Sequence, residues 1–250
     1  ILLSECKCEA YAYGHQCCDF SDGTLVCLTP GESISMKENN KEFPSKGWIL
    51  AFHPDLICGT PLGLNIHNYT FFSYCPEEAL HLSLREKQII LEFLERIRQE
   101  LERCIDRHSK KIISKYIELL LDYCTRFYER QFITRSEVNK KVFREFNHLL
   151  DNHFNVKVSL STDVLSDEYC ANLLHLSPAY FNDLLKYEIG KEFKEYIQFK
   201  RFEIAKGWLV NTDKTLGQIA QELGFSNSQY FSRLFKKITG CSPNEFRMPN

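Results

Sequence analysis

Residues 1 to about 75 alternate short apolar runs with turn sequences. The runs are rich in β-branched and aromatic residues, and the turns include SDGT from Ser21, PGES from Pro30 and NNKEFPSKG from Asn39. Short runs of this composition between turn residues are typical of antiparallel strands. We therefore expect a β-barrel or sandwich in this part of the chain.

From Ser83 onward the apolar positions recur at helical spacing. A long amphipathic helix is expected there, followed by helices at about Lys111–Arg130 and Ser136–His153. The first of these helices carries an apolar stripe opposite a face of Glu and Arg, made of Ile89, Ile90, Phe93, Leu94, Ile97, Leu101 and Ile105. Such a stripe packs either against its own domain or against a second copy of the chain, and the pattern leaves both open.

The segment NVKVSLSTDV, from Asn155 to Val164, interrupts the helical pattern. We expect it to be a linker, with one domain over residues 1–155 and another over residues 156–250. A chain of 250 residues is long enough for two domains, each with its own core. The expected fold is therefore α+β, with strands followed by helices in the first domain and helices alone in the second.

The C-terminal part contains an internal repeat with a period of about 50 residues. One copy, SDEYCANLLHLSPAYFNDLLKYEIGKEFKEYI, begins at Ser166, and the other, TLGQIAQELGFSNSQYFSRLFKKITGCSPNEFR, begins at Thr215. The two copies need a one-residue insertion before their Tyr-Phe pairs, and the matched residues are Ala171 with Ala220, Leu174 with Leu223, Ser177 with Ser226, Tyr180-Phe181 with Tyr230-Phe231, Lys186 with Lys236 and Gly190 with Gly240. One supersecondary unit therefore occurs twice.

The second copy has the residues of a helix, a tight turn and another helix. Thr215 with Gln218, and Ser226 with Gln229, are candidate capping boxes at the two helix starts. Gly224 between them suits a left-handed turn position. This copy is therefore expected to be a helix-turn-helix motif.

The first copy has the same order of signals. Ser177 is expected to be the N-cap of the second helix, with Pro178 at the first helical position. His175 stands where the other copy has Gly224, and His is among the residues that tolerate a positive φ. The chain therefore carries two helix-turn-helix motifs in tandem.

The second helix of each motif has a polar face suited to the major groove of DNA. Along Asn227 to Ile238, a face expected to be buried holds Tyr230, Phe231, Leu234, Phe235 and Ile238, and the opposite face holds Gln229, Ser232, Arg233 and Lys236. Gln pairs with adenine, Arg with guanine and Ser with either, while Lys236 and Lys237 can neutralise phosphates. The corresponding face of the first motif holds Ala179, Asn182, Asp183 and Lys186.

A single helix is expected between the motifs, from Phe193 to Leu209. Its length of about 26 Å can place two reading helices near successive major-groove segments, which lie about 34 Å apart in straight DNA. Some bending of the DNA would bring the two groove segments closer, to the separation that this helix spans.

Composition adds little to this assignment. The formal net charge is −2, so any basic surface for DNA must be local. No apolar run approaches the roughly 20 residues of a membrane span, and the N-terminal sequence lacks the basic start and the cleavage site of a secretory signal. The eleven cysteines are odd in number, and Cys104, Cys124 and Cys170 lie in helix-like patterns, so we expect reduced thiols in a cytoplasmic protein.

The segment LGFSNSQYFSRLFKKITGCSPNEFR, from Leu223 to Arg247, resembles the C-terminal signature of the AraC/XylS family of bacterial transcription regulators. The resemblance extends from about Ser161 to Arg247 and implies a sequence-specific regulator that binds double-stranded DNA. By this resemblance the residues that face bases are Ser228, Gln229, Ser232 and Arg233 in the second motif, and Ala179, Asn182 and Asp183 in the first.

The N-terminal part resembles, less specifically, the cupin-like β-barrel domain that many members carry, on the segments DGTLVCLTPGESI and GWILAFHPDLI. That resemblance implies a domain that binds a small-molecule effector and forms a homodimer. An alternative is that this domain binds no small molecule and serves only for contacts with a second copy or with RNA polymerase.

Asp183 departs from the family pattern, because basic or polar residues are frequent at its position. A carboxylate only accepts hydrogen bonds, so it suits DNA only if it accepts from a cytosine amino group or pairs with Lys186. We therefore assign more of the base reading to the second motif. The complete set of expected DNA-binding residues is Ser177, Ala179, Asn182, Asp183, Lys186, Asn227, Ser228, Gln229, Ser232, Arg233, Lys236 and Lys237.

The alternative to a regulator is a cupin-type metal sensor or enzyme in which DNA binding is secondary. Its candidate metal ligands are His15, His53, His67 and His81. These lack a His-x-His spacing with a nearby Glu, so histidines of the surface or the core are favoured. Cys6-Lys7-Cys8 and Cys17-Cys18 are not metal-knuckle spacings, and redox sensing through them is a minor alternative. We expect no catalytic residue, no metal and no cofactor.

Overall fold

The computed structural model describes residues 1–4, 22–32, 47–155 and 165–247. Contacts divide the chain into two compact units. Unit 1 consists of Ile1–Asn139 with Leu176–Tyr180, and unit 2 consists of Lys140–His175 with Phe181–Asn250. Most of the expected linker from Asn155 to Val164 lies outside the described residues, and the predicted boundary near Asn155 stays a prediction.

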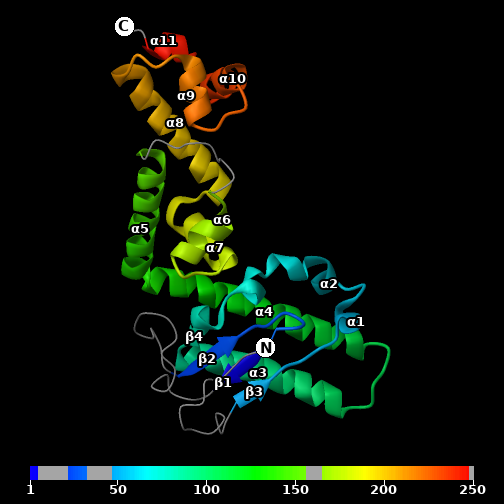
Figure 1. The fold of residues 1–250 in the computed structure, drawn as a ribbon. Coiled ribbons are helices and arrows are strands. Elements are labelled where there is room, and N and C mark those ends of the chain that lie inside the picture. The colour runs from blue at the N-terminus through cyan, green and yellow to red at the C-terminus, as the bar shows by residue number, and fades with distance from the viewer. Residues whose placement is uncertain (5–21, 33–46, 156–164, 248–250) are drawn as a thin grey trace. The chain divides into compact units, whose positions relative to one another are not determined.

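Four short strands of unit 1 form an open antiparallel sheet (Figure 1). Their order is β3-β1-β2-β4, and the strands are β1 (Leu2–Ser4), β2 (Gly23–Val26), β3 (Gly47–Ile49) and β4 (Leu80–Leu82). The register places Leu3 opposite both Leu25 and Trp48. Antiparallel strands are thus confirmed for this part of the chain, and within the described residues they close no barrel.

Residues 54–78 form short helical turns, so the strands expected up to about residue 75 are wrong here. The turns are α1 (Pro54–Ile57), α2 (Pro61–Asn65), η2 (Ile66–Asn68), η3 (Thr70–Ser73) and η4 (Pro76–Glu78). Three of them begin with proline, whose fixed φ suits the first turn of a helix and which cannot donate to a β-ladder. Thr60 caps α2 by accepting from the Gly63 amide at 3.3 Å.

Two long helices of unit 1 pack against each other, α3 (Leu84–Glu102) and α4 (Ser109–Thr134). Ile90, Leu94 and Ile97 of the predicted stripe are buried. That part of the stripe therefore belongs to the core of unit 1. Leu101, in the last turn of α3, and Ile105, beyond its end at Glu102, are exposed instead.

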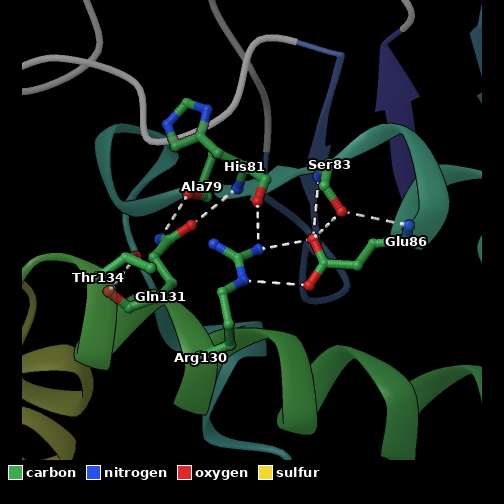
Figure 2. A network of polar contacts seen from close by, with 7 residues as sticks. All are labelled: Ala79, His81, Ser83, Glu86, Arg130, Gln131 and Thr134. Atoms are coloured by element: carbon green, nitrogen blue, oxygen red, sulfur yellow. Dashed lines mark hydrogen bonds and ion pairs between the residues drawn. The ribbon is translucent and has the colours of Figure 1, made fainter.

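Side chains of α4 bind the outward edge of β4 (Figure 2). The buried Gln131 donates from Nε2 to the Ala79 carbonyl at 3.2 Å and accepts at Oε1 from the His81 amide at 2.8 Å. Arg130 donates to the His81 carbonyl at 2.6 Å and also pairs with Glu86, which caps α3. These bonds fix β4, and the η4 turn before it, on helix α4.

The regular elements of unit 2, over its described residues, are all helices (Figure 1). After α5 (Ser136–Asn155), which begins in unit 1, they are α6 (Asp167–Leu173), α7 (Pro178–Ile189), α8 (Phe193–Asn211), α9 (Leu216–Glu222), α10 (Ser228–Thr239) and α11 (Pro243–Arg247). The helices predicted at 111–130, 136–153 and 193–209 are confirmed with slightly longer bounds. In the part of the chain that the structure describes, no helix is both long and apolar enough to cross a membrane.

The described cysteines are free thiols, and three of them are buried: Cys27, Cys124 and Cys170. Burial raises the pKa of Cys27 to about 12 and that of Cys170 to about 11, so both stay protonated. Cys104 lies beyond the end of α3 and is exposed, so its predicted place in a helix is wrong. The cysteines of the minor redox-sensing alternative, Cys6, Cys8, Cys17 and Cys18, lie outside the described residues.

Candidate nucleic-acid interface

The second motif consists of α9, a turn and α10. Thr215 and Gln218 form the predicted capping box, since the Thr215 hydroxyl accepts from the Gln218 amide at 3.3 Å and the Gln218 side chain accepts from the Thr215 amide at 2.8 Å. Gly224 has a φ of 74°, which confirms the left-handed turn residue. Glycine therefore suits the backbone shape of this turn.

The N-cap of α10 is Asn227, and the predicted cap at Ser226 is wrong. The Asn227 side-chain oxygen accepts from the Tyr230 amide at 2.7 Å. In the first motif Ser177 accepts from the Tyr180 amide, also three residues on. The extra residue of the second copy thus shifts the cap by one position, because the spacing to the capped amide is kept.

One face of α10 is buried, but that face is narrower than the sequence predicts. Phe231 and Phe235 are fully buried in a cluster with Phe202, Ile219 and Ala220. Tyr230 and Ile238 are 45% and 51% exposed, so their predicted burial is wrong. The cluster covers only the central stripe of the helix, whereas a helical wheel assigns half of the circumference to the core.

The opposite face of α10 is polar and open to solvent. Gln229, Arg233, Lys236 and Lys237 are exposed, and Ser228 and Ser232 are partly buried. Within the described residues, the side chains of Gln229 and Arg233 make no hydrogen bond or ion pair. The Ser232 hydroxyl donates to the Ser228 carbonyl at 2.8 Å. This face therefore presents an amide and a guanidinium to solvent, with two ammonium groups in the last turn.

The first motif, α6 and α7, repeats the turn geometry of the second. His175 has a φ of 57°, as predicted for the position of Gly224. The Ser177 hydroxyl accepts from the Tyr180 amide at 3.2 Å, which confirms the N-cap of α7. Gly190 and Gly240 follow the two reading helices with φ of 66° and 84°. The two copies thus share a left-handed residue in the turn, a cap three residues before the bonded amide and a left-handed glycine after the second helix.

The polar side chains of α7 are less available than those of α10. Ala179, Asn182 and Asp183 are partly buried, and of the predicted positions on α7 only Lys186 is exposed. The Asn182 amide donates to the Asp167 carboxylate on α6 at 3.0 Å. Ser177 is 4% exposed. The structure therefore places the predicted residues of α10 on one open face, and those of α7 partly against neighbouring side chains.

Tyr230 is the residue of this surface that sequence reasoning missed. Its ring lies next to Phe225 with a centroid distance of 6.5 Å, while the side chain remains 45% exposed beside Gln229. Its alignment with Tyr180 in the repeat predicts a core position, and Tyr180 is indeed only 5% exposed. No local signal in the sequence separates the two tyrosines.

The described histidines among those considered as metal ligands form no metal-binding group. His53 and His67 are exposed, His81 is buried, and His15 lies outside the described residues. In the ranges that the structure describes, no group of three or more His, Cys, Asp or Glu side chains could hold a metal ion.

Known proteins match mainly the doubled motif. A model of a helix-turn-helix domain matches residues 170–248. YtdP of Bacillus subtilis, an uncharacterized HTH-type transcriptional regulator, is 33% identical over 111 residues, which are 44% of this chain and 14% of that protein. The arabinose operon regulatory protein of Escherichia coli is 31% identical over 101 residues, which are 40% of this chain and 31% of that protein.

A longer match extends into the N-terminal part. YijO of Escherichia coli, also an uncharacterized HTH-type transcriptional regulator, is 24% identical over 225 residues, which are 90% of this chain and 76% of that protein. The chain spans less than a third of the length of YtdP and of the arabinose operon regulatory protein. The tandem helix-turn-helix motifs are thus the part of the chain that is similar to these transcriptional regulators, in agreement with the resemblance of Leu223–Arg247 to the AraC/XylS family.

Proposed function

We propose that the protein regulates transcription by placing α10 and α7 in successive major-groove segments of one DNA site, and that α10 reads most of the base sequence. The observation that carries this proposal is the open polar face of α10, where Gln229 and Arg233 are exposed and have no partner within the described residues. Arg is suited to guanine and Gln to adenine, because each can form two hydrogen bonds with the edge of the base.

The charged end of α10 supports a separate role in affinity. Lys236 and Lys237 lie in its last turn and are exposed, as is Lys186 in α7. Contacts with phosphates position a protein on DNA without reading its sequence. We assign these lysines to phosphates. The 19 residues of α8, a length of about 28 Å, suit two helices that enter neighbouring turns of the groove.

For unit 1 we propose the role that the resemblance to the AraC/XylS family suggests, a cupin-like domain that binds a small-molecule effector and forms a homodimer, with RNA polymerase as a further partner. The antiparallel sheet is compatible with this role. No catalytic residue enters the proposal. A metal sensor or enzyme finds no support among the described histidines.

The test is selection of binding sites from a random duplex library by the purified full chain at near-physiological salt. We expect the wild type to enrich a defined motif and Arg233→Ala to lose preference at one base pair, with a cost of about 1–3 kcal/mol on the cognate duplex. Lys236→Ala is the matched control on the same helix, because loss of a phosphate contact weakens binding to all duplexes alike and reduces its salt dependence.

Two results would contradict the proposal. Equal losses on cognate and random duplexes for both variants would remove the assignment of Arg233 to a base. Absence of any enriched motif across a range of salt concentrations would contradict sequence-specific binding by the free chain.

A further inference from the structure

The start of α7 is bound by a buried carboxylate of unit 1. Glu78, in the η4 turn, is 5% exposed. Its carboxylate accepts from the Ser177 amide at 2.6 Å and from the Ser177 hydroxyl. Leu176–Tyr180 is part of unit 1, so this contact lies within one compact unit although its two residues are 99 positions apart in the chain.

Aromatic packing surrounds the same contact. The Tyr180 ring meets the Tyr74 ring edge to face at a centroid distance of 5.1 Å and lies 5.2 Å from the Phe132 ring. Tyr74, Phe132 and Tyr180 are all buried. The first turn of α7 is therefore held both by polar contacts and by apolar packing.

Hydrogen bonds from α4 and from Cys75 also fix the position of Glu78. The carbonyl of the next residue, Ala79, accepts from the Gln131 side chain, and Arg130 and Gln131 together bind the backbone of His81 (Figure 2). The backbone amide of Cys75 donates to the Glu78 carboxylate at 2.8 Å. The carboxylate is thus aimed at Ser177 by a backbone that α4 fixes in place.

Breaking the contact between Ser177 and Glu78 costs free energy. Burial raises the pKa of Glu78, while the hydrogen bonds from Ser177 and Cys75 act in the opposite direction. A buried carboxylate is tolerated when donors satisfy it, and two of its three donors belong to Ser177. If Ser177 moves away, Glu78 must therefore gain water or a proton.

The second motif shows that a helix of this repeat does not need its first turn to be buried. Its N-cap Asn227 is exposed, and its Tyr230 is 45% exposed where Tyr180 is 5% exposed. The two helices have the same length and similar caps. The difference at their starts therefore comes from Glu78, Tyr74 and Phe132 and not from the motif.

We propose that Glu78 is an autoinhibitory contact that occupies the start of the first reading helix, so that the protein engages DNA first through α10 and adds α7 only when Ser177 leaves Glu78. Backbone amides at helix starts are among the groups that bind DNA phosphates. Here such an amide and the neighbouring hydroxyl are bound by a carboxylate of the same chain. The inference rests on the proposed function, because it assigns α7 to the groove.

The test compares Glu78→Gln with Glu77→Gln in the full chain. Glu77 is the exposed neighbour, so its variant makes the same change in charge without touching Ser177. The probes are a duplex with the complete selected site and a duplex in which only the half bound by α10 is kept. We expect Glu78→Gln to bind the complete site about tenfold tighter, the factor for one charge-assisted hydrogen bond, and the half-site unchanged. Glu77→Gln should match the wild type on both.

Glu78→Ala is a second variant, which removes the acceptor altogether. The Ser177 hydroxyl stays in place to cap α7, and the Ser177 amide and hydroxyl become available to a phosphate. This variant should also tighten binding to the complete site. A cooperative thermal transition is the measure that each variant is folded.

Unchanged or weaker binding to the complete site by both folded variants would overturn the inference, since the contact would then have no inhibitory role. This failure is distinct from failure of the proposed function. In the first case the wild type still selects a motif that depends on Arg233, and in the second it selects none.

Discussion

The two helix-turn-helix motifs share the backbone features of their turns and helix starts but have different surroundings. Each has a left-handed turn residue, His175 or Gly224, and a side-chain cap three residues before a tyrosine. The second motif leaves that tyrosine half exposed, and the first buries it. The local sequence of a repeat therefore determines the shape of the unit, whereas its role depends on the residues that other parts of the chain bring to it.

The reading faces differ in the same way. On α10 the amide of Gln229 and the guanidinium of Arg233 are exposed. On α7 the amide of Asn182 already donates to Asp167. The two copies of a duplicated motif can thus differ in role: the polar side chains of one helix are open to a ligand, and those of the other bind residues of the same chain.

The largest expected effect lies in the stability of the two tyrosine positions. Tyr180→Ala should lower the free energy of unfolding by about 3 kcal/mol, because a buried ring that packs on Tyr74 and Phe132 is lost. Tyr230→Ala should cost less than about 1 kcal/mol, since its ring is half exposed. Urea unfolding measures both. Equal costs would mean that the two tyrosines have similar surroundings in solution.

A smaller difference is expected between the reading helices in DNA binding. Asn182→Ala should weaken binding to the cognate duplex by less than about 1 kcal/mol, below the 1–3 kcal/mol or so expected for Arg233→Ala. The reason is that the Asn182 amide is held by Asp167 and is only partly exposed. Titration of a labelled duplex at fixed salt gives both values. A larger loss for Asn182 would move the main base reading to α7.

The smallest effects are expected at the two turns, and they should have opposite signs. Gly224→Ala should destabilise the protein by about 1 kcal/mol, because the left-handed conformation is unfavourable for a residue with a Cβ. His175→Gly should stabilise it by about 0.5–1 kcal/mol for the same reason. Thermal unfolding of both variants provides the comparison. The same sign for both would show that the side chain of His175 contributes more than its backbone costs.

Features that depend on near neighbours in the chain could be predicted from the sequence. The Thr215 capping box, the Ser177 cap and the left-handed turn residues all depend on residues within four positions of one another, and the doubled motif follows because these signals occur twice. The sequence predicts the cap of α10 at Ser226, one residue before the actual cap Asn227. Both residue types are good caps, and only the distance to the Tyr230 amide distinguishes them.

Features that depend on distant residues could not be predicted. The prolines of residues 54–78 start helical turns in a segment whose apolar runs resemble strands. The burial of Ser177 depends on Glu78, which lies 99 positions away, and no spacing or composition links the two. The exposure of Tyr230 likewise depends on how far the Phe231 and Phe235 cluster extends.

The side chain of Gln131 satisfies backbone groups on the outer edge of the small sheet, at strand β4. The edge of a sheet presents free amide groups on which another chain can add a strand, a first step toward aggregation. On β4 the His81 amide and the Ala79 carbonyl are bound by the Gln131 amide, and the His81 carbonyl by Arg130. Helix α4 therefore supplies what one more strand would supply, and this border offers no template for polymerisation.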